Sequence, residues 1–272
     1  MKKGLRILFI GDIVGPLGVG IFQKHIDAVK KQCDIDAVVV NGENAATDGR
    51  GIVPRIAASL KHNGANVITT GNHVWARREI YQYLSENNDV LRPANFPSGC
   101  PGTGVTTITV QGHTVGIMNL QGRVFMNQHV DCPFKAADSL LTYLNSKTKC
   151  IFIDFHAETT SEKIGLGHYM DGRVTGVVGT HTHVQTADER ILPGGTAFVT
   201  DLGMTGALDS MLGMKTSSIM PHLLTQMPNR FMVEDAGPAI LSGVWIEFDP
   251  MTGKALNIER VLVKDTEFSL NS

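Results

Sequence analysis

The stretch from Ala37 to Asn44, Ala-Val-Val-Val-Asn-Gly-Glu-Asn, joins an unbroken apolar run to a polar turn. Four consecutive apolar residues favour a strand that is covered on both faces, as in the sheets of α/β proteins. The turn that follows carries one carboxylate and two amides. This stretch therefore predicts a buried strand with ligand-type side chains at its carboxyl end.

The same pattern recurs on either side of this stretch. Residues 5–10 form a short β-rich run that ends in Gly11-Asp12, and residues 67–70 form another that ends in Gly71-Asn72-His73. Helical stretches are expected between the three runs, at residues 19–32 and 54–62. Strands and helices that alternate at this spacing predict βαβ units and an α/β sheet.

The rest of the chain adds further β-runs and one more helix. We expect a hairpin over residues 103–110 and 114–120, and a helix over residues 133–145. Further strands are expected at residues 150–155, 174–178, 196–200, 244–248 and 255–263. Residues 203–214 are interpreted as a loop-rich segment. With no internal repeat or composition break, the sequence predicts a single domain over residues 1–272, built on a mixed sheet or on two sheets packed between helices.

The composition argues against several classes of protein. The chain has 24 basic and 26 acidic residues, a net charge of −2, which gives no electrostatic case for a nucleic-acid or anionic-membrane partner. The four cysteines lie far apart and form no C-x-x-C pair, which fits the reducing cytoplasm. No stretch approaches the roughly 20 apolar residues of a membrane span, and the apolar run near the N-terminus is too short for a signal peptide. A soluble, cytoplasmic protein is expected.

Ligand-type residues follow five of the predicted strands. These residues are Asp12, Glu43, Asn44, Asn72, His73, His156, His181 and His183. In α/β sheets the carboxyl ends of the strands gather ligands, so these side chains are expected to converge. Carboxylates, amides and imidazoles without a thiolate suit zinc, manganese or iron. Eight such groups are too many for one tetrahedral ion and suit two ions that share a carboxylate, an arrangement used for in-line displacement at phosphorus.

Each of these residues has a plainer interpretation when it is taken alone. Asp12 could cap a helix, Glu43 and Asn44 could form a solvated turn, and His156 could be a hydrogen-bonded core histidine. The joint pattern favours the metal site over these separate interpretations. The other six histidines are interpreted as structural or surface residues, although one of them, His168, lies in a glycine-rich segment before the last site strand.

These motifs carry a family resemblance. Gly-Asp near the N-terminus, N-G-E-N, G-N-H, a histidine at a strand end and G-T-H-T-H, in that order, resemble the calcineurin-like metallophosphoesterase superfamily. More narrowly, D-I-V-G, N-G-E-N-A-A, T-G-N-H-x-W and V-x-G-T-H-T-H-V-Q-T-A-D resemble the YmdB-type family, whose members are described as 2′,3′-cyclic-nucleotide 2′-phosphodiesterases. The resemblance covers essentially the whole chain and implies two mixed sheets sandwiched between helices, an α/β/β/α architecture.

The resemblance also implies a role for each site residue. Asp12, Glu43, Asn44 and His183 would hold one metal ion, and Glu43, Asn72, His156 and His181 would hold the second. A hydroxide that bridges the ions would attack a cyclic nucleotide in line, and His73 would protonate the leaving oxygen. Iron or manganese is favoured, and zinc or cobalt is compatible. No residue is assigned to substrate binding.

Two features depart from the wider superfamily. Position 14 is Val14 where most members have a metal-binding histidine, and Glu43 stands at the bridging position that is usually aspartate. The YmdB-type pattern shares both changes. Asn44 is the candidate to fill the place of the missing histidine.

Three alternative functions remain open at this point. A phosphomonoesterase or nucleotidase would use the same metals, but no basic cluster lies near the motifs, although Arg50 and Arg123 could approach. A regulatory metal-binding protein with weak phosphodiesterase activity would not need the extra acid His73. A nuclease is disfavoured by the near-neutral charge and the absence of a basic, aromatic stripe. An oligomer is compatible with the apolar residues of 203–227, whereas a membrane partner is not expected.

Overall fold

The apolar run at residues 37–40 forms strand β3 (Ala37–Asn41), which is buried along its whole length in the computed structural model of residues 4–270. Strand β3 pairs in parallel with β1 (Leu5–Ile10) on one side and with β4 (Val67–Thr69) on the other. The predicted βαβ units are confirmed, and the carboxyl ends of the three strands lie at one edge of the sheet. Residues 1–3 and 271–272 of the predicted domain lie outside the described part of the chain.

Seven strands make up the first sheet, in which β3 is near one edge. Its order is β2 (Asp12–Ile13), β11 (Met204–Ala207), β12 (Ala239–Phe248), β1, β3 and β4, with β13 (Ala255–Asp265) paired to β12. Strand β12 runs antiparallel to β1 and to β13, so the sheet is mixed.

Six strands make up the second sheet. Its order is β5 (Val105–Val110), β6 (His113–Gln121), β7 (Ile151–His156), β8 (Gly176–Thr180), β10 (Ala197–Val199) and β9 (Arg190–Ile191). The predicted hairpin is confirmed as the antiparallel pair of β5 and β6. Strands β6, β7 and β8 are parallel neighbours, so their carboxyl ends also lie at one edge.

The two sheets pack face to face through an apolar layer. Phe152 of β7 lies between Phe9 of β1 and Phe248 of β12, with ring centroids 5.3 and 5.2 Å apart. All three rings are almost completely buried. Burial of aromatic rings of this size is a large part of what holds two sheets together.

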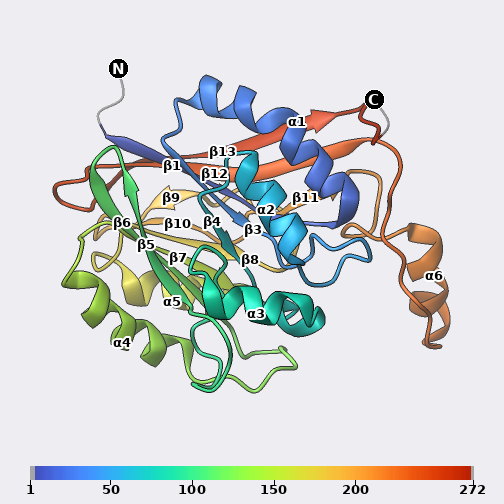
Figure 1. Ribbon diagram of the computed structural model, residues 1–272, viewed down its shortest axis with the longest axis horizontal. Helices are drawn as coiled ribbons and strands as arrows, with labels where there is room; N and C mark the ends of the chain where they lie inside the picture. The colour runs from blue at the N-terminus through green and yellow to red at the C-terminus, as the bar shows by residue number, and fades with distance from the viewer. Residues whose placement is uncertain (1–3, 271–272) are drawn as a thin grey trace.

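Helices cover both outer faces of the sandwich (Figure 1). On the first sheet lie α1 (Gly15–Cys33), α2 (Pro54–His62), the short 3-10 helix η1 (Val74–Ala76) and α3 (Glu79–Glu86). On the second sheet lie α4 (Pro133–Asn145) and α5 (Thr160–Met170). The α/β/β/α architecture implied by the resemblance is therefore confirmed.

The elements that the sequence did not predict include β11, α3, α5 and α6 (Thr216–Thr225). The segment 203–214 contains β11, so its interpretation as loop-rich was wrong over residues 204–207, whose four side chains are buried. Its methionine and glycines give no clear strand pattern, and its hydrogen bonds come from β12 and β2, which lie far away in the sequence. Helix α5 was not predicted, because glycines interrupt it; a Cβ at Gly167 would lie 2.5 Å from the Phe198 ring of the sheet beneath.

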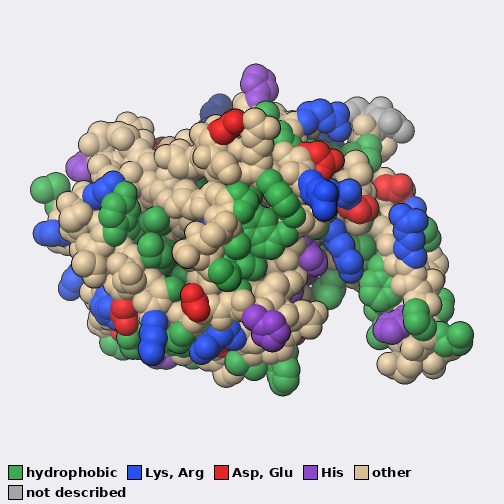
Figure 2. Space-filling view, turned by 60° about the horizontal axis from the view of Figure 1, so that its bottom comes forward, with side chains coloured by type: hydrophobic (Ala, Val, Ile, Leu, Met, Phe, Trp, Pro, Cys, Tyr) green, Lys and Arg blue, Asp and Glu red, His purple; other side chains and the backbone are tan. Residues whose placement is uncertain are grey.

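A last helix, α6 (Thr216–Thr225), projects from the sandwich. Figure 2 shows the segment that carries α6 standing off from the rest of the surface, with hydrophobic side chains along it. Only Ser218 of this helix is buried, and Leu224 is 76% exposed. Among the described residues, no helix is long and apolar enough to cross a membrane.

Candidate metal centre

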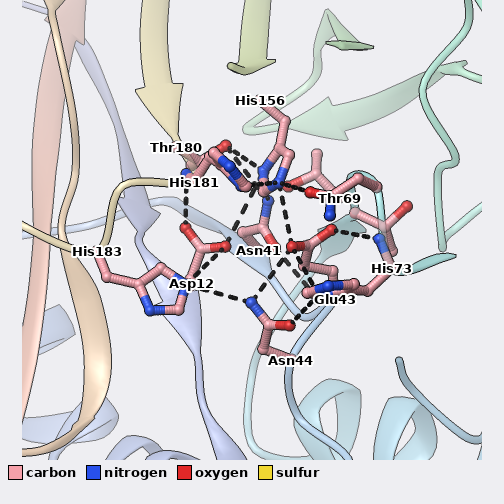
Figure 3. Close-up of polar contacts among 12 residues, drawn as sticks. Asp12, Asn41, Glu43, Asn44, Thr69, His73, His156, Thr180, His181 and His183 are labelled. Atoms are coloured by element: carbon pink, nitrogen blue, oxygen red, sulfur yellow. Dashed lines mark hydrogen bonds and ion pairs between the residues drawn. The ribbon is translucent and has the colours of Figure 1, made fainter. Parts of the chain in front are cut away.

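The structure brings all eight predicted site residues together, between the carboxyl ends of strands from both sheets. Figure 3 labels all of them except Asn72. Strand β2 supplies Asp12, and β7 ends at His156. The other six follow strands: Glu43 and Asn44 after β3, Asn72 and His73 after β4, and His181 and His183 after β8. Convergence of these loops is the outcome expected for parallel strands whose carboxyl ends share one edge.

Two completely buried carboxylates lie at the centre of the cluster. Asp12 and Glu43 are both 0% exposed. The Oδ2 atom of Asp12 accepts a hydrogen bond from the backbone N–H of His181 at 3.1 Å. Its other oxygen, Oδ1, has no hydrogen-bond partner within residues 4–270. The imidazole nitrogens of His183 and His156 approach it, at 3.6 and 3.9 Å. Since a buried carboxylate oxygen without a hydrogen bond is costly, this arrangement fits a cation that the oxygen would bind.

On one side of the centre, Glu43 meets two imidazoles. Its Oε1 lies 3.1 Å from Nε2 of His156, and Nδ1 of His181 lies 3.0 Å from the same Nε2. Ligand atoms of these three residues all lie within 4.8 Å of one another, a separation that allows them to bind one ion. The amide oxygen of Asn72 lies 2.9 Å from His156 Nε2, so it faces the same space.

On the other side, His183 and Asn44 face Asp12. Nε2 of His183 lies 3.6 Å from Asp12 Oδ1 and 3.2 Å from Nδ2 of Asn44. The other ring nitrogen of His183 is 3.0 Å from the backbone carbonyl of Leu212 and donates to it, which directs Nε2 into the centre. Figure 3 shows His181 beside His156 in the upper part of the view, and His183 beside Asp12 below them to the left.

The turn formed by His181, Thr182 and His183 does not continue the extended backbone of strand β8. Strand β8 ends at Thr180, and His181 and His183 have positive φ angles of 101° and 66°. The alternation of side chains along the strand therefore does not continue through residues 181–183. Left-handed backbone costs of order 1–3 kcal/mol at a non-glycine residue, so the surrounding structure must hold this turn.

A buried ion pair holds the turn from behind. Asp201 Oδ2 accepts hydrogen bonds from Thr182 N at 3.1 Å and from Thr182 Oγ1 at 2.7 Å. The ammonium group of Lys163 lies 2.6 Å from the same oxygen, and both side chains are almost completely buried. Sequence reasoning missed this pair. Asp201 follows β10, and Lys163 lies in a helix that was not predicted, so no local pattern links them.

A second group of polar side chains orients His156. Thr180 Oγ1 lies 3.0 Å from Nδ1 of His156 and donates to Asp154 at 2.7 Å. The amide nitrogen of Asn41 lies 3.4 Å from a polar atom of each of these three side chains. Gly71 is required here for space, because a Cβ at that position would lie 2.1 Å from the His156 ring. Hydrogen bonds to the far side of a metal-binding imidazole fix the orientation of its ring in this way.

The charges of the centre shift the pKa values of its members. Burial alone would lower the pKa of His156, but the charge of Glu43 and its hydrogen bond outweigh burial and raise it to about 9. Burial and then the positive charge of His156 lower the pKa of His181 to about 3. Burial favours the neutral form of Glu43, yet the attraction of His156 holds its pKa well below the usual range. The carboxylates are thus ionised, and His181 offers a free lone pair.

His73 occupies a different position from the other imidazoles. Its backbone N–H donates to Glu43 Oε2 at 3.1 Å, and its Nδ1 lies 2.7 Å from the amide oxygen of Asn44. The side chain is 30% exposed, so the ring lies at the surface of the cluster and not inside it.

Other residues considered from the sequence do not join the cluster. His168 is exposed on α5. Arg50 lines a separate cavity of about 770 Å³, together with Arg230 and Phe231, and none of the eight site residues lines that cavity. The backbone of Arg123 is held by Glu162, at the start of a loop beside His156.

The fold and the cluster together define the class of the protein. Two mixed sheets between helices, with carboxylates, amides and imidazoles gathered at the strand ends, form the calcineurin-like metallophosphoesterase fold. The family described as YmdB-like protein matches residues 8–261, and the chain belongs to this family.

The relatives cover nearly the whole chain. It is 48% identical over 261 residues to a 2′,3′-cyclic-nucleotide 2′-phosphodiesterase of Bacillus subtilis strain 168, covering 96% of this chain and 98% of that protein. A crystal structure of a novel phosphatase from Mycoplasma pneumoniae has a TM-score of 0.91 at 32% identity, covering 98% and 95% of the two chains. A hypothetical protein from Thermus thermophilus has a TM-score of 0.89 at 36% identity, covering 96% and 100%.

Proposed function

We propose that this protein is a metal-dependent phosphodiesterase that hydrolyses 2′,3′-cyclic nucleotides. The observation that carries the proposal is the cluster of two buried carboxylates, one with an oxygen that accepts no hydrogen bond, surrounded by amide and imidazole groups. The name of the Bacillus subtilis relative, at 48% identity over nearly the full chain, supports the substrate class.

Seven residues would hold two metal ions in this proposal. Asp12, Glu43, Asn44 and His183 would hold the first, and Glu43, Asn72, His156 and His181 the second. The donors are oxygen and nitrogen atoms without a thiolate, which suits iron or manganese. Two bound ions would supply an activated water as nucleophile and neutralise charge on the phosphoryl oxygens. His181 and His183 would bind different ions, which is supported by their contacts with His156 and Asp12 respectively.

His73 would act as the general acid. An alkoxide is a poor leaving group, so a proton must reach the ribose oxygen as the ester bond breaks. The ring lies at the exposed side of the cluster, with Nδ1 held by Asn44, so its Nε2 is the atom that would donate this proton.

Asn44 links the first metal to this acid. Its amide nitrogen now faces Glu43 and His183, and its oxygen faces His73. Binding a metal through Oδ1 would require the amide to turn over, away from its present contact with Nδ1 of His73.

The alternatives differ in what surrounds the metals. A phosphomonoesterase needs cations to hold a dianion, and the guanidinium-lined cavity of Arg50 and Arg230 does not include the metal cluster. A purely regulatory metal protein would have no use for a partly exposed imidazole held beside the ligands. A cytoplasmic location completes the proposal, since all four cysteines are free thiols.

The test compares wild-type protein with His73→Ala. Both are assayed on 2′,3′-cyclic AMP and on adenosine 3′-monophosphate, and metal content is measured by mass spectrometry. We expect turnover of the cyclic diester but little of the monoester. His73→Ala should keep its metals and lose about 10²–10⁴-fold in kcat, the usual contribution of a general acid.

A matched control is His113→Ala, which removes a histidine at the start of β6, outside the cluster. It should keep both metals and activity. A wild-type protein that hydrolyses the monoester faster than the cyclic diester would contradict the proposed substrate class. Undiminished turnover in His73→Ala would contradict the assigned acid.

A further inference from the structure

The loop of residues 122–128 runs along the edge of the metal centre. It follows β6, and the N–H of Gly122 donates to the backbone carbonyl of His156 at 2.9 Å. At its other end, the side chain of Gln128 donates to the backbone carbonyl of Asn72 at 3.2 Å. Phe125 stands midway, so its Cα lies within about 11 Å of both anchoring residues. Both anchors are attached to residues proposed to hold the same metal ion.

This loop has a defined conformation. The buried carboxylate of Glu162 accepts hydrogen bonds from the backbone N–H groups of Arg123 and Val124 at 3.0 and 3.2 Å. Gly122 packs so closely against the next segment that a Cβ there would lie 2.6 Å from Ala157 and from Glu162. The hydrogen bonds to Glu162 therefore fix the backbone of this loop beside the metal centre.

Phe125 is held in an unfavourable state by this loop. Its side chain is 86% exposed, the largest exposed fraction among the large hydrophobic residues of the described chain. Its φ angle is +60°, in the left-handed region that a bulky aromatic residue rarely adopts. Neither the exposed ring nor the strained backbone contributes to the core, so neither is explained by folding.

The other residues with positive φ angles show where such strain occurs in this protein. Within residues 4–270, the non-glycine residues with a positive φ angle are Asp34, Gln111, Phe125, His181, His183, Leu212 and Gln226. Asp34 and Gln226 cap the ends of helices, and Gln111 lies in the β5–β6 turn, where this conformation is ordinary. The remaining four belong to the metal centre or to segments hydrogen-bonded to it. Strain that collects at one site indicates function there.

We propose that Phe125 provides the face on which the base of the nucleotide substrate stacks. The inference rests on the proposed function. With the phosphate held by the metal pair, the ribose and base must extend beyond the cluster toward its rim, where this loop lies. Every nucleobase has a π-face that stacks on an aromatic ring, which explains why an apolar ring is exposed there.

The chemistry of phenylalanine also sets the kind of specificity. Its ring has no hydrogen-bonding group, so it recognises the flat face of a base and not the pattern of donors and acceptors on its edge. The protein should therefore accept all four bases. Larger purine rings should bind more tightly than pyrimidines.

The experiment uses variants that keep the left-handed backbone. Phe125→Asn removes the ring and tolerates positive φ, and Phe125→Trp keeps an aromatic face. Val124→Ala is the matched control, because Val124 is 44% exposed on the same loop and its backbone contact to Glu162 is retained. The substrates are 2′,3′-cyclic AMP and glycerol 1,2-cyclic phosphate, which has the same five-membered cyclic diester without a base. Calorimetry measures the Kd for adenosine 3′-monophosphate.

Phe125→Asn should raise KM for cyclic AMP and Kd for the mononucleotide by about 5- to 150-fold, the range of one base–aromatic stack. It should leave kcat for cyclic AMP and kcat/KM for the base-free diester unchanged. Phe125→Trp and Val124→Ala should behave like the wild type.

Two negative results have different meanings. Equal KM and Kd in wild type and Phe125→Asn would overturn the role of Phe125, whatever happens to the oligomeric state; a changed oligomer alone would assign the ring to a subunit contact. A wild type that hydrolyses neither diester would overturn the proposed function, while the Kd values for the mononucleotide would still decide the role of Phe125.

Discussion

His156 is the residue at which burial and charge conflict most directly. Its ring is completely buried, yet Glu43 raises its pKa to about 9, so in the metal-free protein it carries a proton at neutral pH. The neighbouring His181, with a pKa of about 3, stays neutral. One proton on His156 thus partly balances the two buried carboxylates when no metal does.

This pair predicts how the stability of the metal-free protein depends on pH. A histidine whose pKa is higher in the folded state stabilises the fold fully below its unfolded pKa of about 6.5. That contribution is lost as pH rises through about 9. The free energy of unfolding of chelator-treated protein should therefore fall between pH 6.5 and pH 9, by on the order of 3 kcal/mol.

Urea unfolding at the two pH values measures this change. Saturating Mn²⁺ is the control, because a metal takes the place of the proton and should remove the loss at high pH. Equal stability of the metal-free protein at pH 6.5 and pH 9 would contradict the assigned charge of His156.

Among the elements, the turn after β8 positions two of the proposed metal ligands at once. Thr182 lies between His181 and His183, and both its N–H and its hydroxyl donate to Asp201, which Lys163 of α5 holds in place. Helix α5, strand β10 and the turn therefore form one support for the histidines.

Thr182→Val tests this support, since valine has nearly the same shape and lacks only the hydroxyl. We expect Mn²⁺ affinity to fall about 10–100-fold, as for other side chains that orient metal ligands. The free energy of unfolding of the metal-free protein should fall by only about 1 kcal/mol, the usual value of one hydrogen bond. Calorimetric Mn²⁺ titration and urea unfolding measure the two effects.

Thr182→Ser is the matched control, because serine retains the hydroxyl donor and should keep the wild-type affinity. A loss of stability without a change in Mn²⁺ affinity would mean that the hydroxyl supports the fold but not the metal centre.

Some helices and strands could be predicted from the sequence and others could not. Strands β1, β3 and β4 could be predicted because each is a local apolar run, and their polar ends pointed to residues that the structure brings together. Helix α5 and strand β11 could not, since glycines that exist for close packing disguise the pattern of both.

At the scale of the whole molecule, the site depends on two sheets that face each other. Asp12 and Glu43 come from the first sheet, and His156 and His181 from the second, so the apolar layer around Phe152 also fixes the distances between these four side chains. We propose that residues 1–272 form a single domain, in which case the urea curves described above should each show one transition. Two separated transitions would contradict this.

Packing between distant elements explains which features of the site the sequence did not predict. Asp201 and Lys163 meet only because α5 packs against β8 and β10, and the left-handed turns at His181 and His183 follow from those contacts. The exposed ring of Phe125 carries no signal until the loop is seen beside Asn72 and His156. The residue types of the proposed ligands can be read from short stretches of sequence, whereas the contacts that hold them in place form only when distant elements pack together.

We propose that Glu43 lies between two metal ions. An anomalous difference map from crystals of the Mn²⁺-loaded protein tests this arrangement. We expect two peaks roughly 3.5–4 Å apart, one on either side of the Glu43 carboxylate. One peak is expected beside His183 and the other beside His156. A single peak, or two peaks that do not share Glu43, would show that Glu43 does not bridge two ions.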